Sequence, residues 1–260
     1  MIAPFCSVRN LSVQYGQEVA LKSVDLDIIR GERLAIIGES GSGKSTLARA
    51  LAGLLPERAK IEGNISWPAL GHAPLPGRDF GFVFQDPGTS LNPVLTIGEQ
   101  VAEGARRHLG LNWRQAYDRA EELLERVRIP QTTSAMRAFP HQLSGGQRQR
   151  VAIAAAIAAK PALLIADEAT SALDVVVQAE IVRLLDGLVR EEGMTLLFIT
   201  HDIALASGFV DRVAVFRGGE LLEEGPVRSV LSSPISSYTA ALIASHRDLS
   251  TPPLIAEVVS

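Results

Sequence analysis

The chain has 260 residues, of which 47% are hydrophobic and 21% charged, close to the roughly 45–50% and about 25% typical of soluble globular domains. Lys and Arg number 25 against 29 Asp and Glu, a formal net charge of −4, which excludes a basic chain that coats nucleic acid or anionic lipid. The longest apolar run, residues 151–159, is too short to span a membrane, since a spanning helix needs roughly 20 residues. Cys6 is the single cysteine, which excludes an internal disulfide and a cysteine-built metal site. With no secretory signal visible, we expect a cytosolic globular protein.

The first third of the chain alternates short apolar stretches with turn residues, a pattern typical of strands. Val24, Leu26 and Ile28 occupy alternate positions, which predicts a strand that pairs antiparallel with the preceding one. A helix follows the glycine-rich turn after Ile37 and ends before Pro56. In chain order we expect strands at 7–15, 21–29 and 34–37, a helix at 45–55, a loop at 67–77 and a strand at 80–84.

Residues 88–158 lack strand signals, and we interpret them as an inserted helical subdomain. Thr96 and Glu99 have the spacing of a capping box, the pattern that starts a helix. Asn112 starts a second helix, whose apolar residues recur with the 3.6-residue period of an amphipathic helix. We expect these apolar residues to lie in the core: Trp113, Ala116, Tyr117, Ala120, Leu123, Leu124 and Val127.

After Pro161, strand and helix signals alternate again until a C-terminal tail at residues 226–260. Strands interleaved with helices form mainly parallel sheets covered by helices on both faces, so the predicted fold class is α/β. The expected elements are strands at 163–166 and 195–200, a helix at 176–190, and a hairpin of 213–216 with 220–222 around Gly218 and Gly219.

A phosphate-binding pattern, G-x-x-x-x-G-K-[ST], lies between the predicted strand 34–37 and the helix after it. Its glycines let backbone N–H groups surround an anion, Lys44 can reach the β- and γ-phosphates, and the Ser45 hydroxyl can bind magnesium. The alternative is an ordinary glycine-rich turn. The predicted nucleotide-binding residues are Gly38, Glu39, Ser40, Gly41, Ser42, Gly43, Lys44, Ser45 and Thr46.

Two carboxylates follow the apolar strand at 163–166. The carboxyl end of a parallel strand faces the ligand crevice, so Asp167 is placed to hold the magnesium shell and Glu168 to polarise an attacking water. The alternative is a solvated acidic pair, which the apolar run before it disfavours.

A second anion-binding pattern occurs at Ser144, Gly145, Gly146 and Gln147. Ser-Gly-Gly at a helix start can bind a phosphate, although Ser144 alone is explained equally well as an N-cap. Together with the first pattern it raises the question of why one nucleotide site needs two phosphate cradles.

In this order and spacing, the motifs resemble those of the ATP-binding cassette (ABC) ATPases, over residues 15–201. The resemblance implies that residues 1–260 form one nucleotide-binding domain: a P-loop NTPase (RecA-like) core, an N-terminal antiparallel β subdomain and the inserted helical subdomain. In this family the Ser-Gly-Gly-Gln segment binds the γ-phosphate of ATP held by the opposite subunit. Two chains would therefore pack head to tail and enclose two ATP molecules.

The resemblance also implies roles for single residues. Tyr15 matches the aromatic residue that stacks on adenine, and Asp174 matches the loop that crosses the dimer interface. Gln85 matches the glutamine that senses magnesium and the attacking water, Glu168 the general base, and His201 the histidine that contacts the γ-phosphate. The implied cofactors are ATP and Mg²⁺, with Ser45, Gln85 and Asp167 around the metal.

A narrower resemblance is to the importer ATPases for oligopeptides, dipeptides and nickel. Residues 85–93, 96–100, 170–179 and 237–242 are similar to that subfamily. Ala169 stands where the family has proline, Ser236 and Ser237 replace a histidine-proline pair, and the cysteine-bearing tail of some members is missing, so no iron–sulfur cluster is implied.

The resemblance thus implies an ATP-hydrolysing importer subunit, peripheral on the cytoplasmic face of the inner or plasma membrane. Its expected partners are a second ATPase subunit, either a related chain or a second copy of this chain, and two membrane permease subunits. A periplasmic or lipid-anchored binding protein is an indirect partner, and no nucleic acid is expected. The cargo, peptide or nickel, stays open. The alternative is a soluble ABC ATPase of DNA repair or translation, which the absence of a long coiled-coil insertion disfavours.

Overall fold

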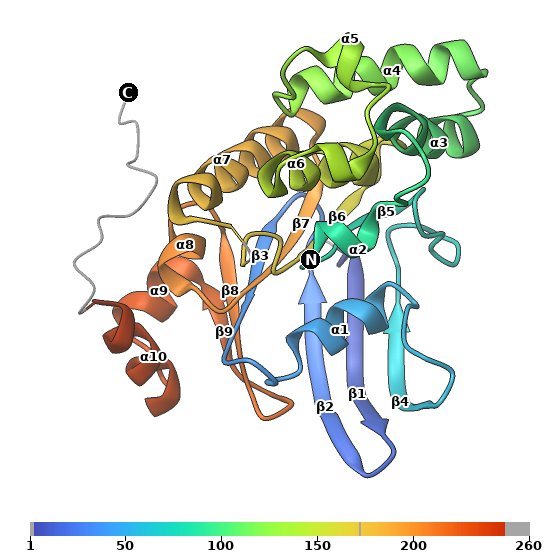
Figure 1. Ribbon diagram of the computed structural model, residues 1–260. Helices are drawn as coiled ribbons and strands as arrows, with labels where there is room; N and C mark the ends of the chain where they lie inside the picture. Colours follow the sequence, from blue (N-terminus) through green and yellow to red (C-terminus); the bar gives the residue numbers. More distant parts are fainter. Residues whose placement is uncertain (1–2, 172, 248–260) are drawn as a thin grey trace. The chain divides into compact units, whose positions relative to one another are not determined.

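The computed structural model describes residues 3–171 and 173–247 (Figure 1). The chain divides into two compact units, Met1–Pro74 with Thr195–Ser260, and Leu75–Met194. Each unit contains both strands and helices, so the mixed α/β character predicted from the sequence is confirmed. None of the helices in the described ranges has the length and apolar character needed to cross a membrane.

The first unit contains a three-stranded antiparallel sheet in the order β2-β1-β4. The predicted pair is confirmed, with Cys6 opposite Ile28 and Tyr15 opposite Glu18. The third strand was not predicted, because its sequence carries few apolar residues and most of its side chains are exposed. The strands are β1 (Cys6–Tyr15), β2 (Glu18–Ile28) and β4 (Ala59–Ser66).

The same unit contains the strand that leads to the predicted phosphate loop. β3 (Arg33–Ile37) pairs in parallel with β7 (Thr195–Thr200) and with β8 (Arg212–Arg217). Every residue of β7 is buried, as expected for a parallel strand covered on both faces. β9 (Glu220–Pro226) returns antiparallel to β8 and confirms the predicted hairpin.

Among the described residues, the first unit contains four helices, and the first of them is shorter than predicted. It ends at Leu51 and not Leu55, because Gly53 adopts a positive φ and the Leu54 N–H donates back to the Arg49 carbonyl. The helices are α1 (Lys44–Leu51), α8 (Ile203–Ser207), α9 (Val227–Ser232) and α10 (Ser237–Arg247).

The second unit combines two parallel strands with helices. β5 (Phe80–Val83) pairs with β6 (Leu163–Asp167), which is buried along its whole length. The residues between these strands form helices and turns. The helices of this unit are α2 (Pro87–Ser90), α3 (Ile97–Leu109), α4 (Trp113–Arg126), α5 (Thr132–Ala135), the 3₁₀ turn η1 (Pro140–Gln142), α6 (Gly145–Ile157) and α7 (Val175–Glu192).

The predicted helix starts in this unit are confirmed, and the predicted core is mostly correct. Capping boxes join Thr96 to Glu99 and Asn112 to Gln115. The prediction for Trp113 is wrong, since its side chain is 47% exposed. It occupies the first position of α4, where the Arg106 guanidinium covers its ring at 4.5 Å. Tyr117 is half-buried, whereas the other predicted core residues, Ala116, Ala120, Leu123, Leu124 and Val127, are fully buried.

Candidate functional site

The predicted phosphate loop connects β3 to α1 in the first unit (Figure 1). Gly43 is the N-cap of α1 with φ +98°, a conformation that L side chains rarely adopt. The Ser42 N–H donates to the Glu39 carbonyl at 3.2 Å, and the Gly219 N–H donates to the Ser42 carbonyl at 3.1 Å. The loop is thus closed by its own backbone and braced by the hairpin between β8 and β9.

Lys44 folds into the centre of this loop. Its side chain is almost completely buried, and Nζ donates to the Gly38 and Glu39 carbonyls, each at 2.8 Å. Ser45 and Thr46 follow in the first turn of α1 and are half-buried. Because helix N-termini carry partial positive charge, a buried ammonium at this point makes the loop an electropositive cradle that suits a phosphate group.

His201 lies at the same end of the sheet as the phosphate loop. Ile37 is paired with Thr200 in neighbouring parallel strands, so Gly38 and His201 both follow the carboxyl ends of these strands. The His201 side chain is exposed, and the next residue, Asp202, caps α8 by accepting from the Leu205 N–H at 2.9 Å. The structure therefore brings the predicted γ-phosphate histidine to the phosphate-loop edge.

Tyr15 is the last residue of β1 and is half-buried. Its backbone lies between Glu18 on β2 and Ala59 on β4. Stacking of Tyr15 on adenine stays a prediction.

In the second unit the structure brings Gln85, Asp167 and Glu168 to one strand edge. Val83 is paired with Ala166, so Gln85 follows β5 where the two carboxylates end β6. The Asp167 side chain is buried, whereas Gln85 is exposed.

Glu168 is half-buried and adopts φ +47°, an uncommon left-handed conformation. Its carbonyl accepts hydrogen bonds from the Ser171 N–H and from Ser171 Oγ, both at 3.1 Å. These bonds close the turn in which Ala169 stands. The turn therefore begins directly after the buried Asp167, the last residue of β6.

The Ser-Gly-Gly-Gln segment begins α6 in the same unit. Ser144 Oγ accepts from the Gln147 N–H at 3.2 Å, and the Ser144 N–H donates to Gln147 Oε1 at 2.9 Å. A Cβ added to Gly146 would lie 3.1 Å from Cγ1 of Val177, so the segment lies beside the start of α7. Asp174 caps that helix by accepting from the Val177 N–H at 3.0 Å.

The site residues therefore fall into two sets. The first unit holds Tyr15, the phosphate loop and His201. The second holds Gln85 with the two carboxylates, and the Ser144 segment with Asp174. Sequence reasoning missed a contact to the loop from the C-terminal helix, where the Tyr238 hydroxyl accepts a hydrogen bond from the Glu39 N–H at 3.2 Å.

Among the described residues, no three His, Cys, Asp or Glu side chains lie close enough together to hold a metal ion by themselves.

Burial raises the pKa of the Cys6 thiol to about 12, so Cys6 is an inert core residue.

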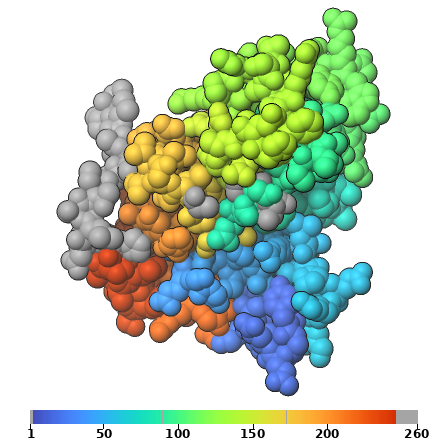
Figure 2. Space-filling view, in the orientation of Figure 1, coloured from blue at the N-terminus to red at the C-terminus, as the bar shows by residue number. Residues whose placement is uncertain are grey.

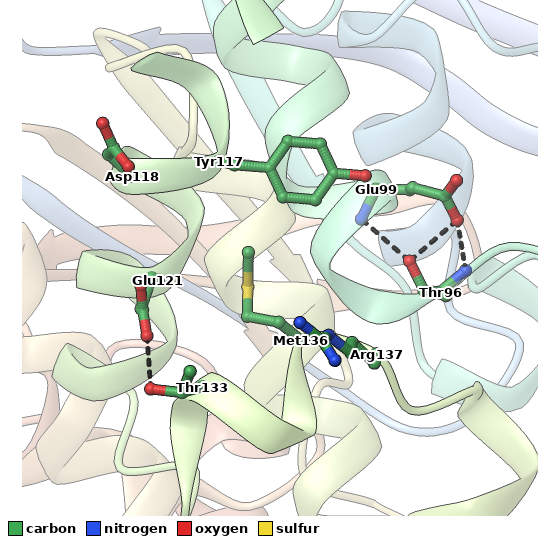
Figure 3. Close-up of a pocket in the computed structure, with 8 residues that line it drawn as sticks. All are labelled: Thr96, Glu99, Tyr117, Asp118, Glu121, Thr133, Met136 and Arg137. Atoms are coloured by element: carbon green, nitrogen blue, oxygen red, sulfur yellow. Dashed lines mark hydrogen bonds between the residues drawn. The ribbon is translucent and has the colours of Figure 1, made fainter. Parts of the chain in front are cut away.

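A cavity of about 440 Å³ opens among the helices of the second unit (Figure 3). Figure 3 shows Glu121 bonded to the Thr133 hydroxyl, and Glu99 bonded to Thr96. None of the predicted nucleotide-binding residues lines this cavity. Its lining residues are Thr96, Glu99, Tyr117, Asp118, Glu121, Thr133, Met136 and Arg137.

Comparison with known proteins agrees with this set of motifs. A sequence model of the ABC transporter family matches residues 21–171. A putative peptide import ATP-binding protein of Brucella melitensis is 44% identical over 260 residues, which cover 95% of this chain and 78% of the relative. A glutathione import ATP-binding protein, GsiA of Salmonella typhimurium, is 42% identical over 92% of this chain but only 41% of its own length. A peptidoglycan transport ATP-binding protein, YejF of Agrobacterium fabrum, is 43% identical over 96% of this chain and 50% of its own length.

Solved structures give the same result. The dimeric ABC transporter cassette MJ0796 matches with a TM-score of 0.72 and 32% identity, over 86% of this chain and 99% of that chain. The same cassette in a dimeric post-hydrolysis state, bound to ADP and Pi, matches with a TM-score of 0.73 and 33% identity, over 86% and 99%. CbiO1 of Clostridium perfringens, part of the cbiONQ transporter complex, matches with a TM-score of 0.74 and 29% identity, over 95% and 98%.

The phosphate loop predicts a difference between two glycine substitutions. Gly43→Ala places a Cβ 2.5 Å from the Ala20 carbonyl oxygen, whereas a Cβ at Gly41 meets nothing within 4 Å. Both positions have positive φ, which costs an alanine about 1–2 kcal/mol. We expect Gly43→Ala to lower the free energy of unfolding in urea clearly more than Gly41→Ala does. Equal losses would contradict the tight packing of Gly43 on β2.

Proposed function

This chain belongs to the ABC transporter family, and we propose that it hydrolyses ATP in sites shared between two subunits to drive the import of peptides. It is the ATP-binding and ATP-hydrolysing subunit of an ABC importer. Its fold is that of ABC ATPase cassettes, with a P-loop NTPase core. The observation that carries the shared-site proposal is that one chain holds two glycine-containing helix starts, with N-caps at Gly43 and at Ser144, and that a helix start of this kind can bind a phosphate.

For the site, we propose that the phosphate loop, residues 38–46, holds the triphosphate while Tyr15 stacks on the adenine. Glu168 is the general base, Gln85 senses magnesium and the attacking water, and His201 contacts the γ-phosphate. Residues 144–147 and Asp174 act on the nucleotide of the opposite subunit. The support is the placement of each residue at a strand end or helix start within its unit.

Magnesium fits the donor atoms that the chain offers. The Ser45 hydroxyl, the Gln85 amide and the Asp167 carboxylate are all oxygen donors, the type that Mg²⁺ prefers. Asp167 is buried at the end of β6, which suits a carboxylate that binds a cation. When bound, the metal would neutralise charge on the phosphates, while Glu168 accepts the proton of the attacking water.

Peptides are the cargo that we propose. The relatives reported above are named for the import of peptide and glutathione and for the transport of peptidoglycan, and none of these three names nickel. The same relatives give no support to a role in DNA repair or translation. We place the chain on the cytoplasmic face of the membrane, bound to two permease subunits that receive cargo from a binding protein.

For the permease contact, we propose the helical segment 88–158 and its cavity (Figure 3). The lining carries three carboxylates, on Glu99, Asp118 and Glu121, against one guanidinium, on Arg137. This charge suits basic side chains on the cytoplasmic surface of a membrane protein, where Lys and Arg are enriched.

Substitution of the proposed base tests the chemical step. Glu168→Gln keeps the size of the side chain and removes its ability to accept a proton. We expect kcat for ATP hydrolysis to fall about 100- to 10,000-fold, the usual contribution of a general base, while ATP binding persists. Phosphate release and nucleotide titration measure the two effects. Retained hydrolysis would remove Glu168 from this role.

Complementation between two inactive variants tests the shared sites. Lys44→Ala damages the phosphate loop, and Ser144→Glu places a negative charge at the second cradle, so each homodimer should be inactive. A mixed dimer keeps one intact pair, the loop of one chain with the Ser144 segment of the other. We expect roughly half of the wild-type rate in the mixed dimer, because one of two symmetry-related sites survives. An inactive mixed dimer would show that both cradles act within one chain.

Charge reversal tests the permease contact. Asp118→Lys combined with Glu121→Lys should weaken binding to the permease by about tenfold or more, because like charges across an interface are strongly unfavourable. Binding to permease in detergent or nanodiscs measures this. Glu103→Lys is the matched control for Asp118→Lys alone, since each reverses one charge and Glu103 is exposed on α3 and does not line the cavity. An equal effect of the control would indicate general charge repulsion and not this cavity.

A further inference from the structure

The peptide unit between Gly38 and Glu39 is held at both ends. Its carbonyl, on Gly38, accepts a hydrogen bond from Lys44 Nζ at 2.8 Å. Its N–H, on Glu39, donates to the hydroxyl oxygen of Tyr238 at 3.2 Å. Because a peptide unit is rigid and planar, the bond to Tyr238 also fixes the direction of the carbonyl that holds Lys44.

Tyr238 is itself firmly placed. It is 8% exposed on α10, and the Arg217 guanidinium at the end of β8 lies 4.8 Å from the centre of its ring. Burial raises the pKa of the Tyr238 phenol, so the hydroxyl stays neutral at physiological pH. Figure 2 shows the red segment, which contains α10, against the orange segment that contains β8 and β9.

A buried carboxylate on β9 anchors the start of α10. Glu223 is 7% exposed and accepts hydrogen bonds from the Ile235 N–H at 2.8 Å and the Ser236 N–H at 3.1 Å. Burial alone would raise the pKa of Glu223, but these bonds outweigh it and the pKa is lowered. The carboxylate therefore stays ionised and holds the segment directly before Tyr238. Helix α10 also packs against α8, the helix that follows His201.

We propose that Tyr238 is a positioning residue for ATP binding, which orients the Gly38–Glu39 peptide and through it Lys44. The proposal rests on the proposed nucleotide role of the phosphate loop and adds the C-terminal helix to the ATP site. Tyr238 reaches the loop from the side of α10 and bonds to a peptide N–H, so it need not contact the nucleotide. The carbonyl groups that hold Lys44 are then already in place when ATP binds. Less conformational entropy is lost on binding, and the affinity for ATP is higher.

Tyr238→Phe is the direct test, since it deletes the hydroxyl and keeps the ring under Arg217. We expect the dissociation constant for ATP, measured by titration, to rise about threefold to tenfold, the effect of one net hydrogen bond. The free energy of unfolding in urea, measured on the same variant, reports any purely structural effect. Ser245→Ala is the matched control: it removes an exposed hydroxyl on the same helix, which bonds to the Leu242 carbonyl, and should leave ATP affinity unchanged.

A dissociation constant for Tyr238→Phe within about threefold of wild type would overturn the proposal, whatever the change in stability. Glu223→Gln is the second variant. It loosens the start of α10 without touching the hydroxyl and should weaken ATP binding in the same direction; if Tyr238→Phe failed to fold, unchanged affinity in Glu223→Gln would overturn the proposal. Wild-type protein that binds no ATP would instead refute the proposed function of the loop.

Discussion

The nucleotide site depends on one buried charge. Lys44 Nζ lies in a side chain that is 3% exposed, and burying an ammonium group is costly unless hydrogen-bond acceptors surround it. The loop meets this requirement by turning the Gly38 and Glu39 carbonyls inward. That turn needs residues without a Cβ, which explains the glycine at position 43, where the backbone has positive φ and touches β2. The tight turn therefore supplies the acceptors that the buried lysine requires, while the close approach to β2 requires glycine at position 43.

The two helix starts that the proposed function uses are built differently. At α6 a capping box satisfies the N–H groups of Ser144 and Gln147 with side chains of the same motif. At α1 the N-cap is Gly43, which has no side chain that could cap. At α6 the capped N–H groups are therefore bonded to side chains of the motif itself, whereas no side chain caps the start of α1. This difference suits a site in which one subunit holds the nucleotide and the other approaches it.

Sequence reasoning was correct where the determinants are local. The capping box at Thr96 and the helix starts at Asn112 and Ser144 could be predicted because the interacting atoms lie within four residues. Strand β4 escaped prediction because it is stabilised by pairing with β1 and not by its own apolar pattern. Trp113 fitted the helical period, yet it lies at a helix start where Arg106 covers it. For the helical subdomain at 88–158, the boundaries stay a prediction.

In the candidate site, too, the features set by local sequence could be predicted and those set by distant residues could not. The phosphate loop could be predicted from its spacing, and the ends of β3 and β6 from their apolar runs. The hydrogen bond between Glu39 and Tyr238 joins residues 199 positions apart, and no local pattern encodes such a contact. The conformation of Glu168 was equally hidden, since no propensity predicts a glutamate at φ +47°. Such a conformation costs about 1–3 kcal/mol, and the two bonds from Ser171 to the Glu168 carbonyl offset part of it. Strain of this kind persists only where the surroundings enforce it, so the turn at 168–171 fixes the backbone from which the Glu168 side chain projects.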